Sequence, residues 1–412
     1  MINKKRLWRH LMELGDIGMV EGKGISRFSF TDEDYQAREL VKSYMLQAGL
    51  SVREDVVGNL FGRKEGKKPD RPVVMTGSHV DTVACGGKFD GNLGVLAAIE
   101  VLHTMHDNGV ETELPIEVCV FKDEEGARFS FSMLGSRAIA GMLKPEDLLL
   151  TDKNGVTITE AMKVCGYDPH KYTQAAIPDG KIKAFIETHI EQGKVLECKN
   201  LAVGIVTGIY SSLWMRFRIM GSADHAGGTP MNLRKDALLA AAKVIQYVNE
   251  RAAAAGSGVG TVGRIEVLPG GINIIPDEAI FTVDLRDIDN EAALAMEKDV
   301  IKFAEDVCVV AGLTFAPVEY MHKLPPTPCD KKLQGKIAEA FAMCGQEVLY
   351  LPSGPGHDAM RIAKIAPIGI IFVRCKDGIS HSPDEWTAPE DCEIAANVLY
   401  YTLLNIANED AE

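Results

Sequence analysis

The stretch that decides the fold is PVVMTGSHVDT, residues 72–82, in which an apolar run leads directly into a histidine and an aspartate. Three other short apolar runs, residues 116–121, 184–186 and 368–373, are also followed by acidic residues or histidine. Runs of this length that are rich in Val, Ile and Phe are typical of buried parallel strands. In an open α/β sheet the carboxyl ends of such strands face one crevice. The pattern therefore predicts an α/β fold with a single polar site at that edge.

The polar clusters supply imidazole and carboxylate groups but no thiolate. Such donors suit Zn, Mn, Co or Ni at a catalytic site better than a structural zinc site, which favours cysteine. The candidate ligands are His79, Asp90, Glu125, His189 and His381. These are too many for one tetrahedral catalytic ion with an open position, whereas two ions that share a carboxylate would use them all. Asp90, in the tight turn of residues 88–91, is the predicted bridge.

Two further acidic residues beside these ligands have predicted roles. Asp81 follows His79 by two residues, and we expect its carboxylate to accept the other imidazole N–H and so orient the ring. Glu124 and Glu125 are adjacent at a strand end and point in different directions, so that one can bind metal while the other faces water. Glu124 is then the predicted general base, and afterwards the acid that protonates a leaving nitrogen.

Length, composition and charge bound the remaining possibilities. A chain of 412 residues favours two domains, and its 46% hydrophobic and 25% charged residues are typical of a soluble globular protein. The net charge of −14 argues against nucleic acid or an anionic membrane as a partner. There is no run of 18 apolar residues and no segment of signal-peptide type, which favours the cytoplasm. The nine cysteines form no Cys-x-x-Cys pair and are expected to be reduced.

The order of elements changes after residue 210. The patterns then predict β-α-β-β-α-β, the split unit of ferredoxin-like domains, over residues 213–220, 232–255, 260–267, 279–286, 291–311 and 313–320. A proline-rich connection at residues 324–328 follows, and helix and strand alternation then resumes. Because His381 belongs with ligands of the first half, residues 1–210 and 328–412 are predicted to form one discontinuous metal-binding domain. Residues 211–327 would be inserted in it.

Eight motifs in this order resemble the two-metal aminoacylase and carboxypeptidase-type metallohydrolases, and within them the branch of N-carbamoyl-L-amino acid hydrolases and allantoate amidohydrolases. The resemblance spans nearly the whole chain. The motifs are GSHVDT (77–82), FDG (89–91), DEEG (123–126), HIEQG (189–193), HAGGTPM (225–231), NIIP (273–276), DLR (284–286) and SHSP (380–383). Many peptidases of the wider family carry a carboxylate in place of His189, and the histidine resembles the ureido-cleaving branch.

This resemblance implies a ligand set and a reaction. One ion would be held by His79, Asp90 and His189, and a second by Asp90, Glu125 and His381. Glu124 would act as acid and base. The fold implied is an aminopeptidase-like catalytic domain with a mixed, mostly parallel sheet. An α+β ferredoxin-like domain would be inserted in it, and would serve as a lid and as the surface through which two chains form a homodimer.

The inserted domain would supply residues to the active site. His225 would reach the partner subunit's site and stabilise the tetrahedral oxyanion, as an imidazolium donor can. Asn273 and Arg286 would hold the substrate carboxylate, for which a guanidinium is a natural bidentate partner. Gln192, Gly356 and His357 match further substrate-binding positions. From the residues alone, Arg286 could instead pair with a neighbouring aspartate, Asn273 could serve a turn, and His225 could pair with the preceding aspartate.

The function expected is hydrolysis of the ureido group of an N-carbamoyl-L-amino acid to L-amino acid, ammonia and carbon dioxide. Residues 204–209, 260–263 and 380–386 look like that group of enzymes. The alternatives are allantoate amidohydrolase, aminoacylase or dipeptidase action on an amide, and a binding module that metal merely stabilises. The intact Glu124 argues against the binding module, which needs no general base.

Overall fold

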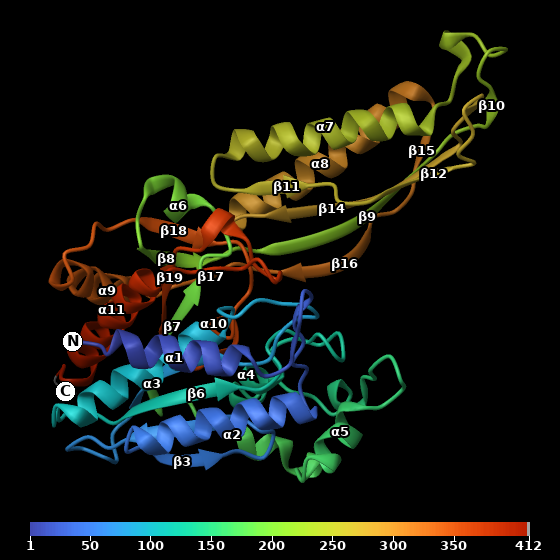
Figure 1. Cartoon of the computed structure of the whole chain (residues 1–412). Helices are drawn as coiled ribbons and strands as arrows, with labels where there is room; N and C mark the ends of the chain where they lie inside the picture. Colours follow the sequence, from blue (N-terminus) through green and yellow to red (C-terminus); the bar gives the residue numbers. More distant parts are fainter. Residues whose placement is uncertain (410–412) are drawn as a thin grey trace. The chain divides into compact units, whose positions relative to one another are not determined.

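The computed structural model describes residues 1–409, which divide into two compact units (Figure 1). The first unit consists of Met1–Thr207 together with the residues from Cys329 onward, and the second is Gly208–Pro328. Within residues 1–409, none of the helices combines the length and the apolar character needed to cross a membrane.

The first unit is built on a mixed sheet. Its four central strands are adjacent and parallel in the order β19-β7-β5-β6: β19 (Ile368–Val373), β7 (Ile182–Ile190), β5 (Val73–His79) and β6 (Ile116–Phe121). Antiparallel strands flank them: β4 (Leu60–Lys64) and β3 (Ser51–Glu54) beyond β6, and β8 (Val203–Ile209) beyond β19, with β18 (Tyr350–Ser353) beside β8. The central strands contain the four apolar runs, and β5 and β7 extend far enough to include His79 and His189. The predicted α/β fold with a mixed sheet is therefore confirmed.

Several helices of this unit pack on the sheet. The longer ones are α1 (Lys4–Gly15), α2 (Asp32–Gln47), α3 (Asn92–Asp107), α9 (Lys331–Met343) and α11 (Pro389–Ala407). The shorter ones are α4 (Leu134–Ile139), α5 (Ile158–Val164), α6 (Val195–Lys199) and α10 (Ala359–Ile362). Thr31 caps α2 by accepting the Asp34 N–H. Nearly all of α3 is buried, so the turn that precedes it is anchored in the core.

The second unit has its own core between one sheet and two helices. The sheet has the order β11-β14-β9-β15, with β12 beside β14 and β16 beside β9. Its elements are β9 (Ser212–Met220), α7 (Ala237–Ala255), β11 (Val259–Thr261), β12 (Ile265–Leu268), β14 (Glu278–Arg286), α8 (Asn290–Ala311), β15 (Thr314–Phe315) and β16 (Glu319–Leu324). Alternate residues of β9 and β14 are buried against the helices, as period-2 strands require.

Three expectations for this unit are corrected by the structure. The helix expected over residues 232–255 begins later, at Ala237, because the Asp236 carboxylate caps it by accepting the Leu239 N–H at 3.0 Å. The strand expected over residues 260–267 is divided into β11 and β12. The strand expected over residues 313–320 is divided into β15 and β16, and the break includes Pro317, which has no N–H to donate to a ladder.

His10 on α1 gives the first unit a predicted sensitivity to acid. Its ring is buried and stacks on Tyr44 with 3.7 Å between centroids, and this burial lowers the pKa of His10 to about 4. The unfolded chain takes up this proton near pH 6.5, so the native state loses stability as the pH falls from about 6.5 toward 4. We expect a loss of about 2 kcal/mol between pH 7.5 and pH 5.

Urea unfolding at these two pH values, in wild type and in His10→Phe, measures the contribution of His10. The phenylalanine ring keeps the stack on Tyr44 but cannot bind a proton. The variant should therefore lose about 2 kcal/mol less than wild type on acidification. An equal loss in both proteins would show that His10 does not cause the pH dependence.

Candidate metal centre

The predicted ligands meet at the carboxyl edge of the parallel strands. His79 is the last residue of β5 and lies level with Phe121, the last residue of β6. His189 is near the end of β7 and lies level with Phe372 of β19. Because the strands are parallel and in register, the loops that follow them leave the sheet on the same side. The acidic loop after β6 and the loop after β19 therefore reach the two histidines.

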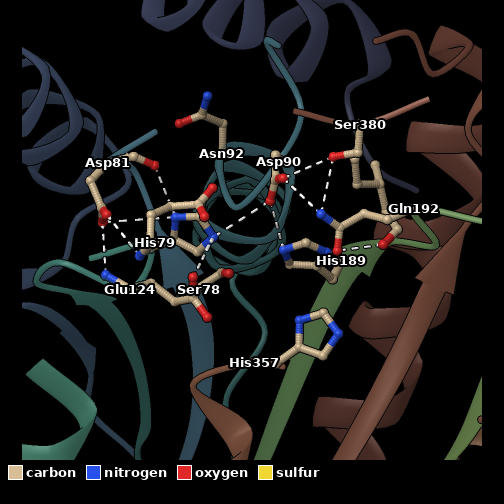
Figure 2. Close-up of polar contacts among 12 residues, drawn as sticks. Ser78, His79, Asp81, Asp90, Asn92, Glu124, His189, Gln192, His357 and Ser380 are labelled. Carbon is tan, nitrogen blue, oxygen red and sulfur yellow. Dashed lines mark hydrogen bonds and ion pairs between the residues drawn. The ribbon is translucent and has the colours of Figure 1, made fainter. Parts of the chain in front are cut away.

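Asp90 lies at the centre of this cluster (Figure 2). Its Oδ1 is 3.6 Å from His79 Nε2 and 3.1 Å from His189 Nε2. Its Oδ2 is 3.1 Å from His381 Nε2, and that same nitrogen is 3.5 Å from Glu125 Oε1. Each carboxylate oxygen of Asp90 thus faces a different group of donors, which is the arrangement expected of a bridging ligand.

The backbone fixes the orientation of the two histidines at the strand ends. His79 Nδ1 lies 3.0 Å from the carbonyl oxygen of Asp81, and His189 Nδ1 lies 3.0 Å from that of Ile190. A carbonyl can only accept, so each Nδ1 carries a proton and is turned away from Asp90, while each Nε2 faces the Asp90 carboxylate. The sequence-based expectation differs here, because the Asp81 carboxylate lies 3.8 Å from His79 Nδ1 and its carbonyl takes the hydrogen bond instead.

The Asp81 carboxylate orients the acidic loop. Its two oxygens accept the backbone N–H groups of Glu124 at 3.2 Å and Glu125 at 3.1 Å. Glu124 is 8% exposed, and its Oε2 lies 3.9 Å from His79 Nε2. Burial raises the pKa of Glu124 well above its usual range, and burial likewise raises the pKa of Glu125 to about 7. A glutamate whose pKa is raised suits a group that takes up and returns a proton.

The groups around Asp90 favour the ionised form of its carboxylate. Although burial opposes its ionisation, hydrogen bonds from His189, His381 and His79 hold the pKa of Asp90 well below its usual range. The hydrogen bond to Asp90 raises the pKa of His381 to about 9. A divalent ion that displaces these protons would satisfy the same carboxylate, and its binding would release protons. Gly91 permits the turn, because its φ is +64° and an added Cβ would lie 2.5 Å from the His79 ring.

The donors of the described residues fit divalent metal ions. Three groups each bring their donor atoms within 4.8 Å of one another: His79, Asp90 and His189; His79, Glu124 and Glu125; and Asp90, Glu125 and His381. All the donors are nitrogen or oxygen, which matches the metals expected from the sequence. The first and third groups share Asp90, as two adjacent ions with one bridging carboxylate would require.

The predicted substrate-binding residues of the first unit lie beside these donors. The Gln192 side chain donates from Nε2 to Asp90 Oδ2 at 2.9 Å and to Ser380 Oγ at 3.0 Å. The His357 ring is buried 4.5 Å from the His189 ring, and its Nε2 lies 2.8 Å from Ser353 Oγ. Burial lowers the pKa of His357 well below its usual range, so the ring is neutral. Gly356 immediately precedes it.

The predicted residues of the second unit lie at two different ends of that unit. His225 in β10 (Asp224–His225) pairs with β13 (Ile274–Ile275), and the Ala226 N–H donates to the Asn273 carbonyl at 2.8 Å. Figure 1 shows β10 at one end of this unit, beyond the end of α7. Arg286 is at the far end of β14, where its Nη2 lies 2.9 Å from Asp284 Oδ2, the pairing named as the alternative. Strand β14, which has nine residues and is about 26 Å long, lies between these two ends of the unit.

The sequence assigned no role to several other polar residues that surround the donors. Ser380 Oγ lies 2.9 Å from Asp90 Oδ2, and the Glu385 carboxylate accepts the Asp90 backbone N–H at 3.0 Å. The buried Glu187 carboxylate accepts the Ser78 hydroxyl at 2.9 Å and a backbone N–H of α10 at 3.1 Å. Ser380 and Glu385 lie in the same stretch, residues 380–386, as the predicted ligand His381. No spacing rule predicts which backbone N–H a loop carboxylate accepts.

Nitrogen and oxygen donors that meet around one buried carboxylate, beside a buried glutamate of raised pKa, are the arrangement expected of a metal-dependent hydrolase. The family model of peptidase family M20/M25/M40 matches residues 75–405, and the chain belongs to that family.

Within this family, the chain is similar over most of its length to amidohydrolases. An N-carbamoyl-L-amino acid amidohydrolase of Geobacillus stearothermophilus is 49% identical over 407 residues, 99% of each chain. An allantoate deiminase of Arabidopsis thaliana is 35% identical over 92% of this chain and 78% of its own. The crystal structure of an amidase of the hydantoinase/carbamoylase family from Burkholderia multivorans superposes with a TM-score of 0.94 at 37% identity, covering 100% of this chain and 99% of that one.

Proposed function

We propose that the protein hydrolyses the ureido C–N bond of N-carbamoyl-L-amino acids to the L-amino acid, ammonia and carbon dioxide. The observation that carries this proposal is the 49% identity, over 99% of both chains, to an enzyme named for that substrate. The site supports it, because the ligand cluster and the buried Glu124 lie together at the sheet edge.

The proposed cofactor is a pair of divalent ions, Zn, Mn, Co or Ni. Their ligands would be His79, Asp90 and His189 for one ion, and Asp90, Glu125 and His381 for the other. When bound, the ions would polarise the carbonyl of the substrate and lower the pKa of water. Glu124 would take a proton from the attacking water and return it to the leaving nitrogen. The Asp81 carboxylate would keep the Glu124 backbone in place for this transfer.

We further propose a homodimer in which the second unit acts as lid and dimerisation surface. Arg286 ends β14, whereas Asn273 lies beyond the other end of that strand, which is about 26 Å long, so the two residues of a single chain cannot hold the same substrate carboxylate. They could do so if each came from a different chain. The end that carries His225 and Asn273 also exposes apolar side chains, with Met231 73% and Ile272 fully exposed, as a surface that packs on a partner would.

The dimer proposal predicts complementation between two inactive variants. His225→Ala removes the proposed oxyanion donor that reaches the partner subunit, and Glu124→Gln removes the base within its own subunit. A mixed dimer would contain one site with both residues intact. After the two purified variants are dissociated together and reassociated, ammonia release should recover to about a quarter of the wild-type rate, since half of the dimers are mixed and each has one working site. If the mixed protein released ammonia no faster than the separate variants, His225 would not act in the partner subunit's site.

The experiment that tests the substrate is ammonia release by protein loaded with Mn, Co, Ni or Zn. N-carbamoyl-L-methionine, its D-isomer and allantoate are compared in parallel, with Glu124→Gln protein as the control for contaminating activity. Release from the L-isomer alone supports the proposal. Release from allantoate alone favours the second candidate, allantoate amidohydrolase, for which the 35% identity to an allantoate deiminase is the specific observation. If none of the three substrates released ammonia, both candidate functions would be overturned. N-acyl amino acids and dipeptides would then be assayed.

A further inference from the structure

We propose that Glu385 is a positioning residue of the metal centre, which holds Asp90 so that its two oxygens face two different ions. The inference rests on the proposed function, because it takes Asp90 as the bridging ligand. Glu385 is 4% exposed. Its Oε1 accepts the backbone N–H groups of Phe89 at 2.8 Å and Asp90 at 3.0 Å, and its Oε2 lies 3.0 Å from Ser380 Oγ.

These contacts hold Asp90 at both its backbone and its side chain. Ser380 Oγ lies 2.9 Å from Asp90 Oδ2 as well as 3.0 Å from Glu385 Oε2. Gln192 Nε2 donates to both Asp90 Oδ2 and Ser380 Oγ. The hydroxyl has one proton, so Ser380 donates to one carboxylate at a time, while the amide of Gln192 keeps its bond to Asp90. Glu385 thus limits both where the Asp90 backbone lies and how its carboxylate is turned.

The two loops around Glu385 are shaped for this contact. An added Cβ at Gly87 would lie 2.3 Å from the Glu385 carboxyl group, so glycine leaves the room that the carboxylate fills. The neighbouring Trp386 ring packs against Phe89, with 5.7 Å between centroids, and against Trp8 of α1 at 5.3 Å. The segment that carries His381 therefore contacts the segment that carries Asp90 twice, through the Glu385 carboxylate and through the Trp386 ring.

The test is the affinity of chelator-stripped protein for Co²⁺, followed by visible absorption without substrate. We expect the affinity of Glu385→Ala for Co²⁺ to be roughly 10–100-fold weaker than that of wild type, because the loss of groups that orient metal ligands has an effect of this size. Glu385→Gln should stay close to wild type, because the amide oxygen still accepts both N–H groups and the NH2 can donate to Ser380 Oγ. Glu385→Asp keeps the charge but is one methylene shorter, and it should bind Co²⁺ more weakly than Glu385→Gln.

Asp287→Ala is the matched control. This fully buried carboxylate of the second unit also accepts a backbone N–H, from Asp289 at 2.9 Å, and a serine hydroxyl, from Ser257 at 3.0 Å. Its loss should lower the melting temperature as the loss of Glu385 does, while Co²⁺ affinity remains that of wild type. A purely structural role for Glu385 would move the melting temperature alone.

Each outcome decides the inference. Wild-type Co²⁺ affinity in Glu385→Ala would overturn it, and so would Glu385→Gln binding as weakly as Glu385→Ala. If Glu385→Ala does not fold, the order of the other two variants decides, and Glu385→Asp binding as tightly as Glu385→Gln would overturn it. The proposed function fails separately. A wild type that binds Co²⁺ but hydrolyses no ureido substrate would overturn that function alone, whereas a wild type that binds no metal would overturn both.

Discussion

Glu124→Gln is expected to lower kcat for ureido hydrolysis by at least about 100-fold, since general acid/base catalysis contributes roughly 10²–10⁴-fold. The side chain is buried beside the donor cluster, with Oε2 3.9 Å from His79 Nε2, and burial raises its pKa. Glutamine has nearly the same shape, so packing should be preserved. It cannot take a proton from water, however, or return one to the leaving nitrogen. Steady-state ammonia release by metal-loaded protein measures the effect.

Two controls separate loss of the base from loss of the site. Metal content of the Glu124→Gln protein should equal that of wild type, because Glu124 is not among the proposed ligands. Glu117→Gln makes the same substitution at another buried glutamate, in β6 itself, where the carboxylate pairs with Arg53 at 2.7 Å. It should leave kcat near the wild-type value. A Glu124→Gln enzyme that keeps more than about a hundredth of the wild-type rate would remove Glu124 from the proton transfers.

The general fold and the meeting of the ligands follow from simple periodicities. The strands 116–121 and 368–373 were predicted with the bounds that the structure has, because a continuous apolar run ends sharply where polar residues begin. Parallel strands leave the sheet at one edge, so the order of polar clusters along the chain was enough to bring His79, His189 and His381 together.

The contacts that tune the site depend on atoms that no periodicity specifies. Asp81 is a clear example, because its carbonyl bonds the imidazole while its carboxylate accepts two backbone N–H groups of the next loop. Glu385 touches Asp90 across 295 residues of chain, through backbone groups that every residue possesses. The separation of Asn273 and Arg286 likewise follows from strand length, which places residues of one motif set at opposite ends of a unit.

Asp90→Asn is expected to have the second large effect, the loss of metal from the site. An aspartate can give one anionic oxygen to each of two ions, whereas asparagine has a single neutral acceptor oxygen and an amide that repels cations. Because changes around ligands already cost roughly 10–100-fold in affinity, removing the shared ligand should weaken binding by at least about 100-fold. Equilibrium dialysis against Co²⁺ or Mn²⁺ should then show less than one ion per chain at concentrations that fill the wild type.

The control for this substitution is Asp55→Asn, which makes the same change at a carboxylate that accepts the backbone N–H groups of Val57 and Asn59. Its metal content should stay at the wild-type value. Asp90→Asn should also lower the pKa of His381, because the hydrogen bond to Asp90 is the main cause that raises it to about 9. If Asp90→Asn still bound two ions per chain with wild-type affinity, Asp90 would not be the bridge. The two ions would then have to be held by His79, Glu125 and the other histidines independently of each other.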